Sequence, residues 1–305
     1  MSGTASPRKD RLDGAGLASL LAVQMLLAFN QIIVAFVNKG LQPVFFAGLR
    51  SALAVIFVWA LLRWRGRPVR LDPSARAAGL MIGAFFAAEF LLLFLALDLT
   101  TVGRASILMY SMPVWFALMA HFGLGERITP RKAVGLAIAF AGTAWAILGA
   151  AGGAGAGQGS LAGDLCALGA GIGWAATAYV ARRPAMRAQG PELQLFWMVL
   201  VSAPILLAVS PLFGPLVREL QPLHMVGLIF QSTVVVAGGF IAWLWLMSVY
   251  PASTVAAFSF LSPVFAILMG AVFLGESLSP AILGPAALVA LGIVLINRAA
   301  VAQQR

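Results

Sequence analysis

The chain has 305 residues, of which 61% are hydrophobic and only 10% are charged. A soluble domain carries about 25% charged residues, and a soluble fold of this size cannot hide so much apolar surface from water. Soluble globular, disordered and disulfide-stapled classes are therefore excluded. A polytopic helical membrane protein remains, and its net charge of +10 is better explained by basic cytoplasmic loops than by nucleic-acid binding. The single cysteine, Cys166, has no partner for a disulfide.

Ten apolar segments are long enough to cross a bilayer, which requires about 20 helical residues. In chain order they are 17–37, 43–62, 77–97, 103–122, 132–150, 161–181, 193–213, 223–247, 252–273 and 281–297. None of them alternates polar and apolar residues as the strands of a membrane barrel do. The first segment lacks a convincing cleavage site, so we interpret it as a retained helix rather than a signal peptide. The sequence predicts an all-α protein with ten transmembrane helices.

The basic residues predict how these helices are oriented, because cytoplasmic loops are enriched in Lys and Arg. With the N-terminus in the cytoplasm, sixteen of the 20 Lys and Arg residues lie in cytoplasmic segments. The four on the other side are Lys39, Arg50, Arg104 and Arg218. We therefore expect a multi-pass protein of the cell membrane, the inner membrane in a bacterium, with both termini in the cytoplasm.

The sequence repeats itself at an offset of 150 residues. Residues 105–130 read ASILMYSMPVWFALMAHFGLGERITP, and residues 255–280 read VAAFSFLSPVFAILMGAVFLGESLSP. A unit of five spans is odd, so the second copy is expected to be inverted in the membrane, as in many secondary transporters. The predicted organisation is a cytoplasmic tail (1–16), a first repeat (17–150), a Gly-rich linker (151–160), a second repeat (161–297) and a cytoplasmic tail (298–305).

At these motifs the chain resembles the EamA-type branch of the drug/metabolite transporter superfamily. The resemblance rests on the ten spans and on the Arg50 segment GLRSALAVIFVWALL. It also rests on the passage ALDLTTVGRASILMYSMPVWFALMA and on two proline-centred spans that each end in Leu-Gly-Glu. The resemblance implies two inverted five-helix repeats around a central cavity, and transport of small metabolites such as amino acids, often outward.

Two ionisable residues deep within the predicted spans are candidates for the site. Glu89 is near the middle of span 3, where an ionised carboxylate is costly unless it meets water or a partner. It is a candidate for proton coupling or for binding a substrate amine; the alternative is a packing residue. Arg50 lies about two turns into span 2 and either holds a substrate carboxylate, pairs with an acid or extends to the headgroups.

Other polar and aromatic side chains at depth are candidates for substrate binding, and each has a packing alternative. They are Asn30, Gln31, Tyr110, Trp115, Trp174, Tyr179, Gln231 and Ser259. The matching prolines Pro113 and Pro263 are candidate hinges, because proline frees a carbonyl one turn earlier. These carbonyls would be near Met109 and Ser259 and would line the cavity, or else the kinks are static.

Several other features are interpreted as structural. Asp98 and Arg104 flank a tight turn between spans 3 and 4, which predicts a local ion pair. Glu126 and Glu276 of the two Leu-Gly-Glu motifs are expected to stabilise their turns. Glycines that recur on one face of a span favour close helix packing, within one subunit or between two. They are Gly135, Gly142 and Gly149 in span 5, and Gly169 and Gly173 in span 6.

These features favour a secondary active transporter that uses alternating access and a proton or substrate gradient. No hydrolase, P-loop or metal motif is present in the sequence, so we expect no enzymatic activity, no cofactor and no bound metal. A passive facilitator or channel is the alternative, and a membrane-embedded enzyme is less favoured. The expected partners are a small-molecule substrate and the lipid bilayer, without nucleic acid, in a monomer or homodimer.

Overall fold

The structure, a computed structural model, is almost wholly helical. It describes residues 13–66, 69, 73–125, 128–151, 160–239, 242, 246, 249, 258, 261–278 and 280–302. Within these ranges the one extended pairing is an isolated bridge between Leu41 and Val217. Six of the described helices are long and apolar enough to cross a membrane, and shorter apolar helices accompany them. The all-α membrane fold predicted from hydropathy is confirmed.

The helices of the first half follow the predicted spans, except that span 4 is divided. They are α1 (Gly14–Val37), α2 (Pro43–Trp64), the short 3-10 turn η1 (Pro73–Ala75), α3 (Arg76–Leu99), α4 (Val102–Met109), α5 (Met112–Leu124) and α6 (Pro130–Ala151). The break between α4 and α5 lies at Tyr110 and Ser111, directly before Pro113. A proline within a helix removes a backbone donor, which accounts for the interruption.

The second half has the same order of elements. They are α7 (Leu161–Ala181), α8 (Pro184–Arg187), α9 (Pro191–Val209), η2 (Ser210–Phe213), α10 (Pro222–Phe230), the π-helix η3 (Gln231–Gly239), α13 (Leu261–Leu274) and α14 (Pro280–Ala302). Most of the predicted junction between spans 8 and 9 lies outside the described residues. Each of the ten predicted spans contains at least one helix within the described residues, and parts of spans 8 and 9 lie outside them.

Local chemistry explains where several helices begin and end. The Asp13 carboxylate accepts from the Gly16 N–H at 2.8 Å, and the Ser160 hydroxyl accepts from the Gly163 N–H at 3.0 Å, so each satisfies an otherwise unpaired first-turn donor. At the other end, α5 and α13 stop at the matching residues Gly125 and Gly275. These have φ values of 71° and 70°, a left-handed conformation that favours glycine. The repeat is therefore visible in the backbone as well as in the sequence.

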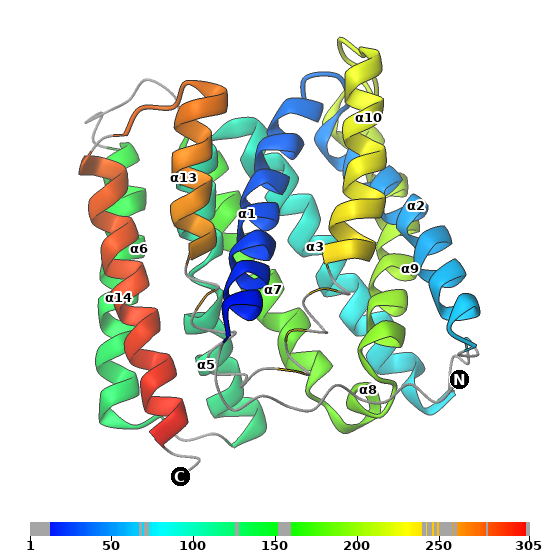
Figure 1. Ribbon diagram of the computed structural model, residues 1–305. Coiled ribbons are helices and arrows are strands. Elements are labelled where there is room, and N and C mark those ends of the chain that lie inside the picture. The colour runs from blue at the N-terminus through cyan, green and yellow to red at the C-terminus, as the bar shows by residue number, and fades with distance from the viewer. Residues whose placement is uncertain are drawn as a thin grey trace.

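The contacts between helices follow the two-fold relation of the repeats: a contact between two helices recurs between their counterparts in the other half. Helix α6 packs against its counterpart α14, and α2 packs against its counterpart α9. The pair formed by α1 and α13 is matched by the pair formed by α7 and α5. In Figure 1, α1 runs upward while α7 runs downward to α8, so counterpart helices have opposite directions. The protein is built from two inverted repeats, as the sequence predicts.

The crossing of α6 and α14 depends on two glycines that also match at the offset of 150. A Cβ on Gly142 would lie 2.9 Å from the backbone nitrogen of Val289, and one on Gly292 would lie 2.5 Å from the backbone nitrogen of Ala139. Each glycine thus lets the backbone of the other helix approach closely. The glycine face predicted for span 5 packs within the chain.

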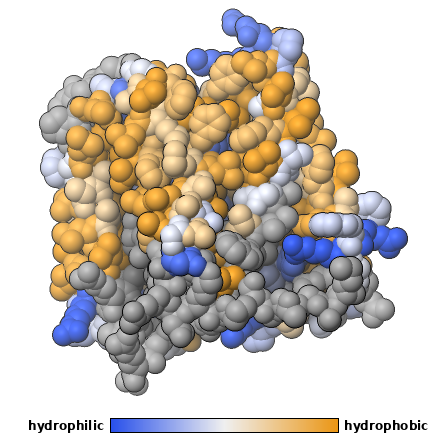
Figure 2. Space-filling model, viewed as in Figure 1, coloured by the Kyte–Doolittle hydropathy of each residue, from blue (hydrophilic) through white to orange (hydrophobic). Residues whose placement is uncertain are grey.

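The outside of the helices suits a lipid environment. Figure 2 shows apolar residues over the sides of the helices, with hydrophilic residues mainly towards their ends. Large apolar side chains such as Phe122, Val272 and Ile56 are 84%, 78% and 59% exposed. Exposed apolar surface on this scale is unfavourable in water and stable in a bilayer.

Candidate functional site

Arg50 is buried in the first half of α2. Its side chain is 2% exposed, and its guanidinium lies 3.8 Å from the centre of the Phe90 ring and 5.4 Å from that of Phe94. These rings on α3 supply cation–π attraction to one flat face of the guanidinium. The Nε and Nη2 atoms have no hydrogen-bond partner. Arg50 therefore lies within the helix bundle and does not reach the headgroups.

Glu89 is buried in the middle of α3 and interacts electrostatically with Arg50. Its carboxylate accepts a hydrogen bond from the Thr177 hydroxyl on α7 at 3.4 Å. A Cβ on Gly173, one turn before Thr177, would lie 3.0 Å from the Glu89 Cα. The small residue allows α7 to approach α3 so closely that the acid is enclosed between them. The structure thus buries Arg50 and Glu89, both predicted site residues, close enough to attract one another, without a direct ion pair between them.

A seam of polar side chains joins α1 to α4 and α13, near the break in span 4. The Ser106 hydroxyl donates to Gln31 at 2.7 Å, and the Ser262 hydroxyl donates to Gln24. The Tyr110 hydroxyl lies close enough to Ser262 to interact with it. We call Gln24, Gln31, Ser106, Tyr110 and Ser262 the polar seam. Its hydrogen bonds link α1 to α4 within the first repeat, and α1 to α13 of the second repeat.

Asn30 and Gln231 bring η3 to α1. The Gln231 amide donates to the backbone oxygen of Asn30 at 2.9 Å, while the Asn30 Oδ1 and Gln231 Oε1 atoms have no partner. Buried polar atoms without partners cost roughly 1–3 kcal/mol each. The start of the π-helix is therefore a place where polar groups remain unsatisfied.

The four aromatic candidates separate into two groups. Tyr110 and Trp174 meet edge to face with ring centres 5.6 Å apart, which connects the polar seam to α7 beside Gly173. Trp115 instead donates to the Ser111 hydroxyl at 3.1 Å and packs against Phe140 on α6.

Tyr179 lies in the last turn of α7. The Arg183 guanidinium donates to its hydroxyl at 3.4 Å, and the ring lies against Gly123. The structure thus groups Tyr110 and Trp174 with the interior residues, and places Trp115 and Tyr179 apart from them.

The two prolines occupy matching positions, each in the first turn of its helix. Pro113 is in the first turn of α5, and the Met109 carbonyl freed by it lies against Gly171 on α7, where a Cβ would be 2.8 Å away. That carbonyl therefore contacts α7 and does not line a hollow. Pro263 is in the first turn of α13, and Ser259 lies outside the described residues.

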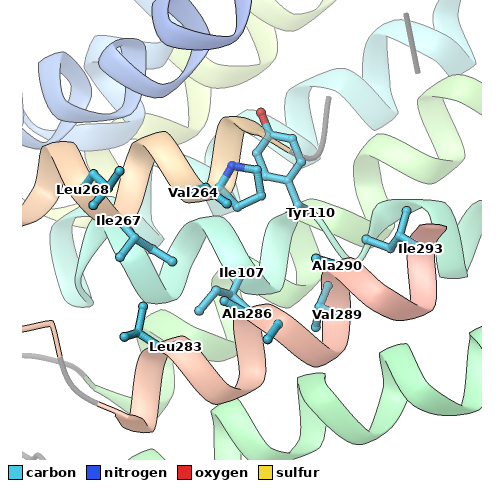
Figure 3. A pocket seen from close by; sticks show the side chains of 12 residues that line it. Ile107, Tyr110, Val264, Ile267, Leu268, Leu283, Ala286, Val289, Ala290 and Ile293 are labelled. Atoms are coloured by element: carbon cyan, nitrogen blue, oxygen red, sulfur yellow. The ribbon is translucent and has the colours of Figure 1, made fainter. Parts of the chain in front are cut away.

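An apolar pocket of about 230 Å³ lies between α4, α13 and α14 (Figure 3). Aliphatic side chains from the three helices line it, with Tyr110 at one side and its hydroxyl pointing away from α14. Of the predicted site residues it includes Tyr110 and Pro263. Its lining offers hydrophobic contact to a ligand but almost no hydrogen bonding.

The predicted ion pair between Asp98 and Arg104 is wrong. Arg104 instead forms a 2.6 Å ion pair with Asp164 on α7, and Asp98 forms a 2.7 Å ion pair with Arg218. Thr100 also donates to Asp164 at 2.8 Å. The tight turn directs the two side chains away from one another and towards the second repeat, so both pairs join the two halves.

Glu276 also reaches into the other repeat. Its carboxylate accepts from the Val102 and Gly103 N–H groups at 2.6 and 3.0 Å, at the start of α4. Burial raises the pKa of Glu276, and the two backbone hydrogen bonds oppose this shift. The expectation that Glu276 stabilises only its own turn therefore understates its role, because it caps a helix of the first repeat. Glu126 lies outside the described residues.

The sequence interpretation missed several polar residues of the interior. Asp164 is fully buried yet lies in the first turn of its helix, where an acid is usually read as a solvated group. Ser106, Thr177 and Ser262 are small residues of the kind that pack between membrane helices, and only their partners reveal their roles. Their spacing from Gln31, Glu89 and Gln24 on neighbouring helices was not readable from one sequence.

The fold and this interior define a polytopic helical membrane transporter. The model of the EamA-like transporter family matches residues 14–148 and, a second time, residues 161–298. The chain therefore belongs to the EamA-like transporter family, a domain type of the drug/metabolite transporter superfamily. The two matches cover the two halves that the internal repeat identifies.

Similar proteins agree with this assignment. The chain is 28% identical over 272 residues to a Bacillus subtilis (strain 168) protein named uncharacterized transporter YvbV, covering 86% of this chain and 85% of that protein. It is 20% identical over 281 residues to uncharacterized transporter YoaV of the same organism, covering 92% and 95%. A solved crystal structure covers 92% of this chain and 97% of its own with a TM-score of 0.64 at 20% identity, which supports the fold.

Proposed function

We propose that this protein is a secondary active transporter that moves a small metabolite, an amino acid or a related compound, out of the cell. The observation that carries the proposal is the buried pair of Arg50 and Glu89, which lies among helices of both repeats. Ionisable groups at membrane depth usually mark a substrate or proton pathway. The site of transport in inverted-repeat transporters lies at the repeat interface, where this pair is found.

Alternating access would proceed by movement of one repeat against the other. Three ties between the halves lie on the side where α13 ends: Arg104 with Asp164, Arg218 with Asp98, and Glu276 with the start of α4. We propose that these ties hold this side closed in the present conformation, and that they separate when it opens. The distribution of Lys and Arg supports assigning this side to the cell exterior.

Glu89 is the proposed coupling residue. A carboxyl group that alternates between a proton and the Arg50 charge can link proton movement to the conformational change, provided that the two facing states bind the proton differently. Thr177 is placed to hold the carboxylate in position on α7. The family and its transporter-named relatives support transport in general, and the interior residues support this particular coupling.

Counterflow in proteoliposomes tests the proposal. We expect the purified protein to exchange labelled amino acids or related metabolites, and an imposed pH gradient to drive their accumulation. Glu89→Gln should retain exchange and lose the response to the gradient. Glu192→Gln, which alters a carboxyl paired with Arg65 at 3.2 Å, is the matched control and should behave as the unmodified protein. Downhill flux without counterflow would indicate a passive facilitator, and unchanged pH-driven accumulation in Glu89→Gln would exclude Glu89 from coupling.

A further inference from the structure

The unpaired edge of Arg50 has the geometry of a carboxylate site. The Nε–H and one Nη2–H of an arginine point the same way in the plane of the guanidinium, so together they form a two-donor fork. This fork matches the two oxygens of a carboxylate side-on. In Arg50 both atoms are buried and have no hydrogen-bond partner.

The surroundings of Arg50 bury this edge without giving it a hydrogen-bond acceptor. The Phe90 ring of α3 lies against the guanidinium, with its centre 3.8 Å from the Cζ atom. Glu89 attracts the guanidinium but forms its hydrogen bond with Thr177. Nothing in the described residues therefore occupies the fork.

In Arg104 the same two donors, Nε and Nη2, bind a carboxylate of the protein. Its Nε donates to Asp164 at 3.2 Å and its Nη2 donates to the same carboxylate at 2.6 Å, which is a side-on pair. Arg50 is buried and Arg104 is largely buried, with its side chain 11% exposed, and both lie at helix contacts of one chain. One fork holds a carboxylate of the protein, and the other is left without one.

We propose that the transported substrate carries a carboxylate that binds side-on to the Nε and Nη2 donors of Arg50. This inference rests on the proposed transport function and names the group that the site recognises. A single negative charge fits better than a phosphate dianion, because Glu89 shares the same buried surroundings. The unpaired fork is satisfied when substrate binds, so binding removes an existing penalty as well as adding a contact.

Binding measured in detergent tests this inference without requiring transport. The purified full-length protein is heated with a panel of L-amino acids, the corresponding amino-acid amides, and phosphate monoesters, and the shift in Tm is titrated. We expect at least one amino acid to stabilise the protein and its amide to bind roughly 10- to 100-fold more weakly, the loss of a charge-assisted pair. Equal binding of amides, binding of phosphate monoesters alone, or no stabilisation by any carboxylate would overturn the proposal.

Arginine variants locate the site. Arg50→Lys keeps the charge but lacks the fork, so it should weaken amino-acid binding by roughly 10- to 100-fold and leave the weak affinity for amides unchanged. Arg63→Lys is the matched control, because Arg63 also contacts an aromatic ring, that of Trp59, at 5.9 Å, and it should bind as the unmodified protein does. Undiminished binding in Arg50→Lys would refute the assignment. Absence of counterflow in a protein that still binds carboxylates through Arg50 would count against the transport proposal alone.

Discussion

The crossing of α6 and α14 and the interior around Arg50 are built in opposite ways. At the crossing, matching glycines bring two backbones together, and the described residues of these helices contain no buried side-chain polar atom without a partner. In the interior, unpaired polar atoms gather on α1, α2 and η3. They belong to Gln24, Asn30, Asn38, Arg50, Ser51 and Gln231, and one further unpaired atom, Trp197 Nε1, lies on α9. Close packing fixes one arrangement, whereas unsatisfied polar groups favour binding or movement.

We infer from this contrast that the α6–α14 crossing holds the two repeats together, whereas the interior around Arg50 binds substrate or changes conformation. Because the backbones of α6 and α14 are in contact at Gly142 and Gly292, the two helices cannot shift against one another without a clash. We therefore expect them to move as one rigid body. The interior pays a penalty for its unpaired atoms, and a ligand or a second conformation can relieve it. Four substitutions test this division, in order of decreasing expected effect.

Asp164→Ala should have the largest effect on stability. The substitution leaves Arg104 buried without its 2.6 Å partner and removes the acceptor of the Thr100 hydroxyl. Loss of one member of a buried pair costs about 3–5 kcal/mol. Asp98→Asn is the control, because its pair with Arg218 is partly exposed and is worth about 0–1 kcal/mol. Thermal unfolding in detergent measures the stability loss of each variant. Equal losses would show that the Asp164 ion pair contributes no more to stability than the Asp98 ion pair does.

Gly292→Ala should destabilise the crossing by about 1–3 kcal/mol, because its Cβ would meet the α6 backbone at 2.5 Å. Backbone atoms cannot move aside as a flexible side chain does. Gly14→Ala places a Cβ where nothing lies within 4 Å, so it should leave the apparent Tm unchanged. A Gly292→Ala protein as stable as the Gly14→Ala protein would refute the tight crossing.

Ser51→Ala should have the opposite sign. The Ser51 hydroxyl is buried without a partner, so removing it relieves a desolvation penalty and should stabilise the protein by about 1 kcal/mol. The apparent Tm of the variant measures this. A fall in Tm would mean that the Ser51 hydroxyl has a hydrogen-bond partner, and that the interior has fewer unpaired polar atoms than the structure indicates.

Glu276→Gln should change the pH dependence of stability by a small amount. Burial raises the pKa of Glu276 above its ordinary value of 4.5, so the folded protein binds a proton more tightly than the unfolded chain does. Its contribution is therefore fully present below pH 4.5 and is lost as the pH rises through the raised pKa. Tm measured across this range should fall more for the unmodified protein than for Glu276→Gln. Parallel curves would show that the carboxyl does not titrate differently in the folded state.

The sequence alone was sufficient for the architecture but not for the pairings. Hydropathy, the five-span unit and the matching Leu-Gly-Glu motifs depend on local composition, which a single sequence records directly. The partners of Asp98 and Arg104 depend on which helices become neighbours, and proximity along the chain gave the wrong answer. Glu276 illustrates the same limit, since its acceptor role involves α4, 173 and 174 residues away in sequence.

Candidate site residues were predictable to different degrees for a physical reason. Arg50 and Glu89 stand out because charge is rare at membrane depth, and the structure places them together. Trp115 and Tyr179 did not join them, since an aromatic residue in a span packs equally well against another helix. Asn30 and Gln31 lie on adjacent helical positions that face different neighbours, so only one of them cross-links α1 to α4.

Labelling of the matching turns tests the central claim, which is that two inverted repeats enclose one shared site. Gly125 and Gly275 are exposed, have the same left-handed backbone and end helices that point to opposite sides in Figure 1. With Cys166 replaced by serine, Gly125→Cys and Gly275→Cys carry equal strain and serve as controls for one another. A membrane-impermeant maleimide should label Gly275→Cys in intact cells and Gly125→Cys only after the membrane is opened. Labelling of both from the same side would contradict the inverted architecture and the site built on it.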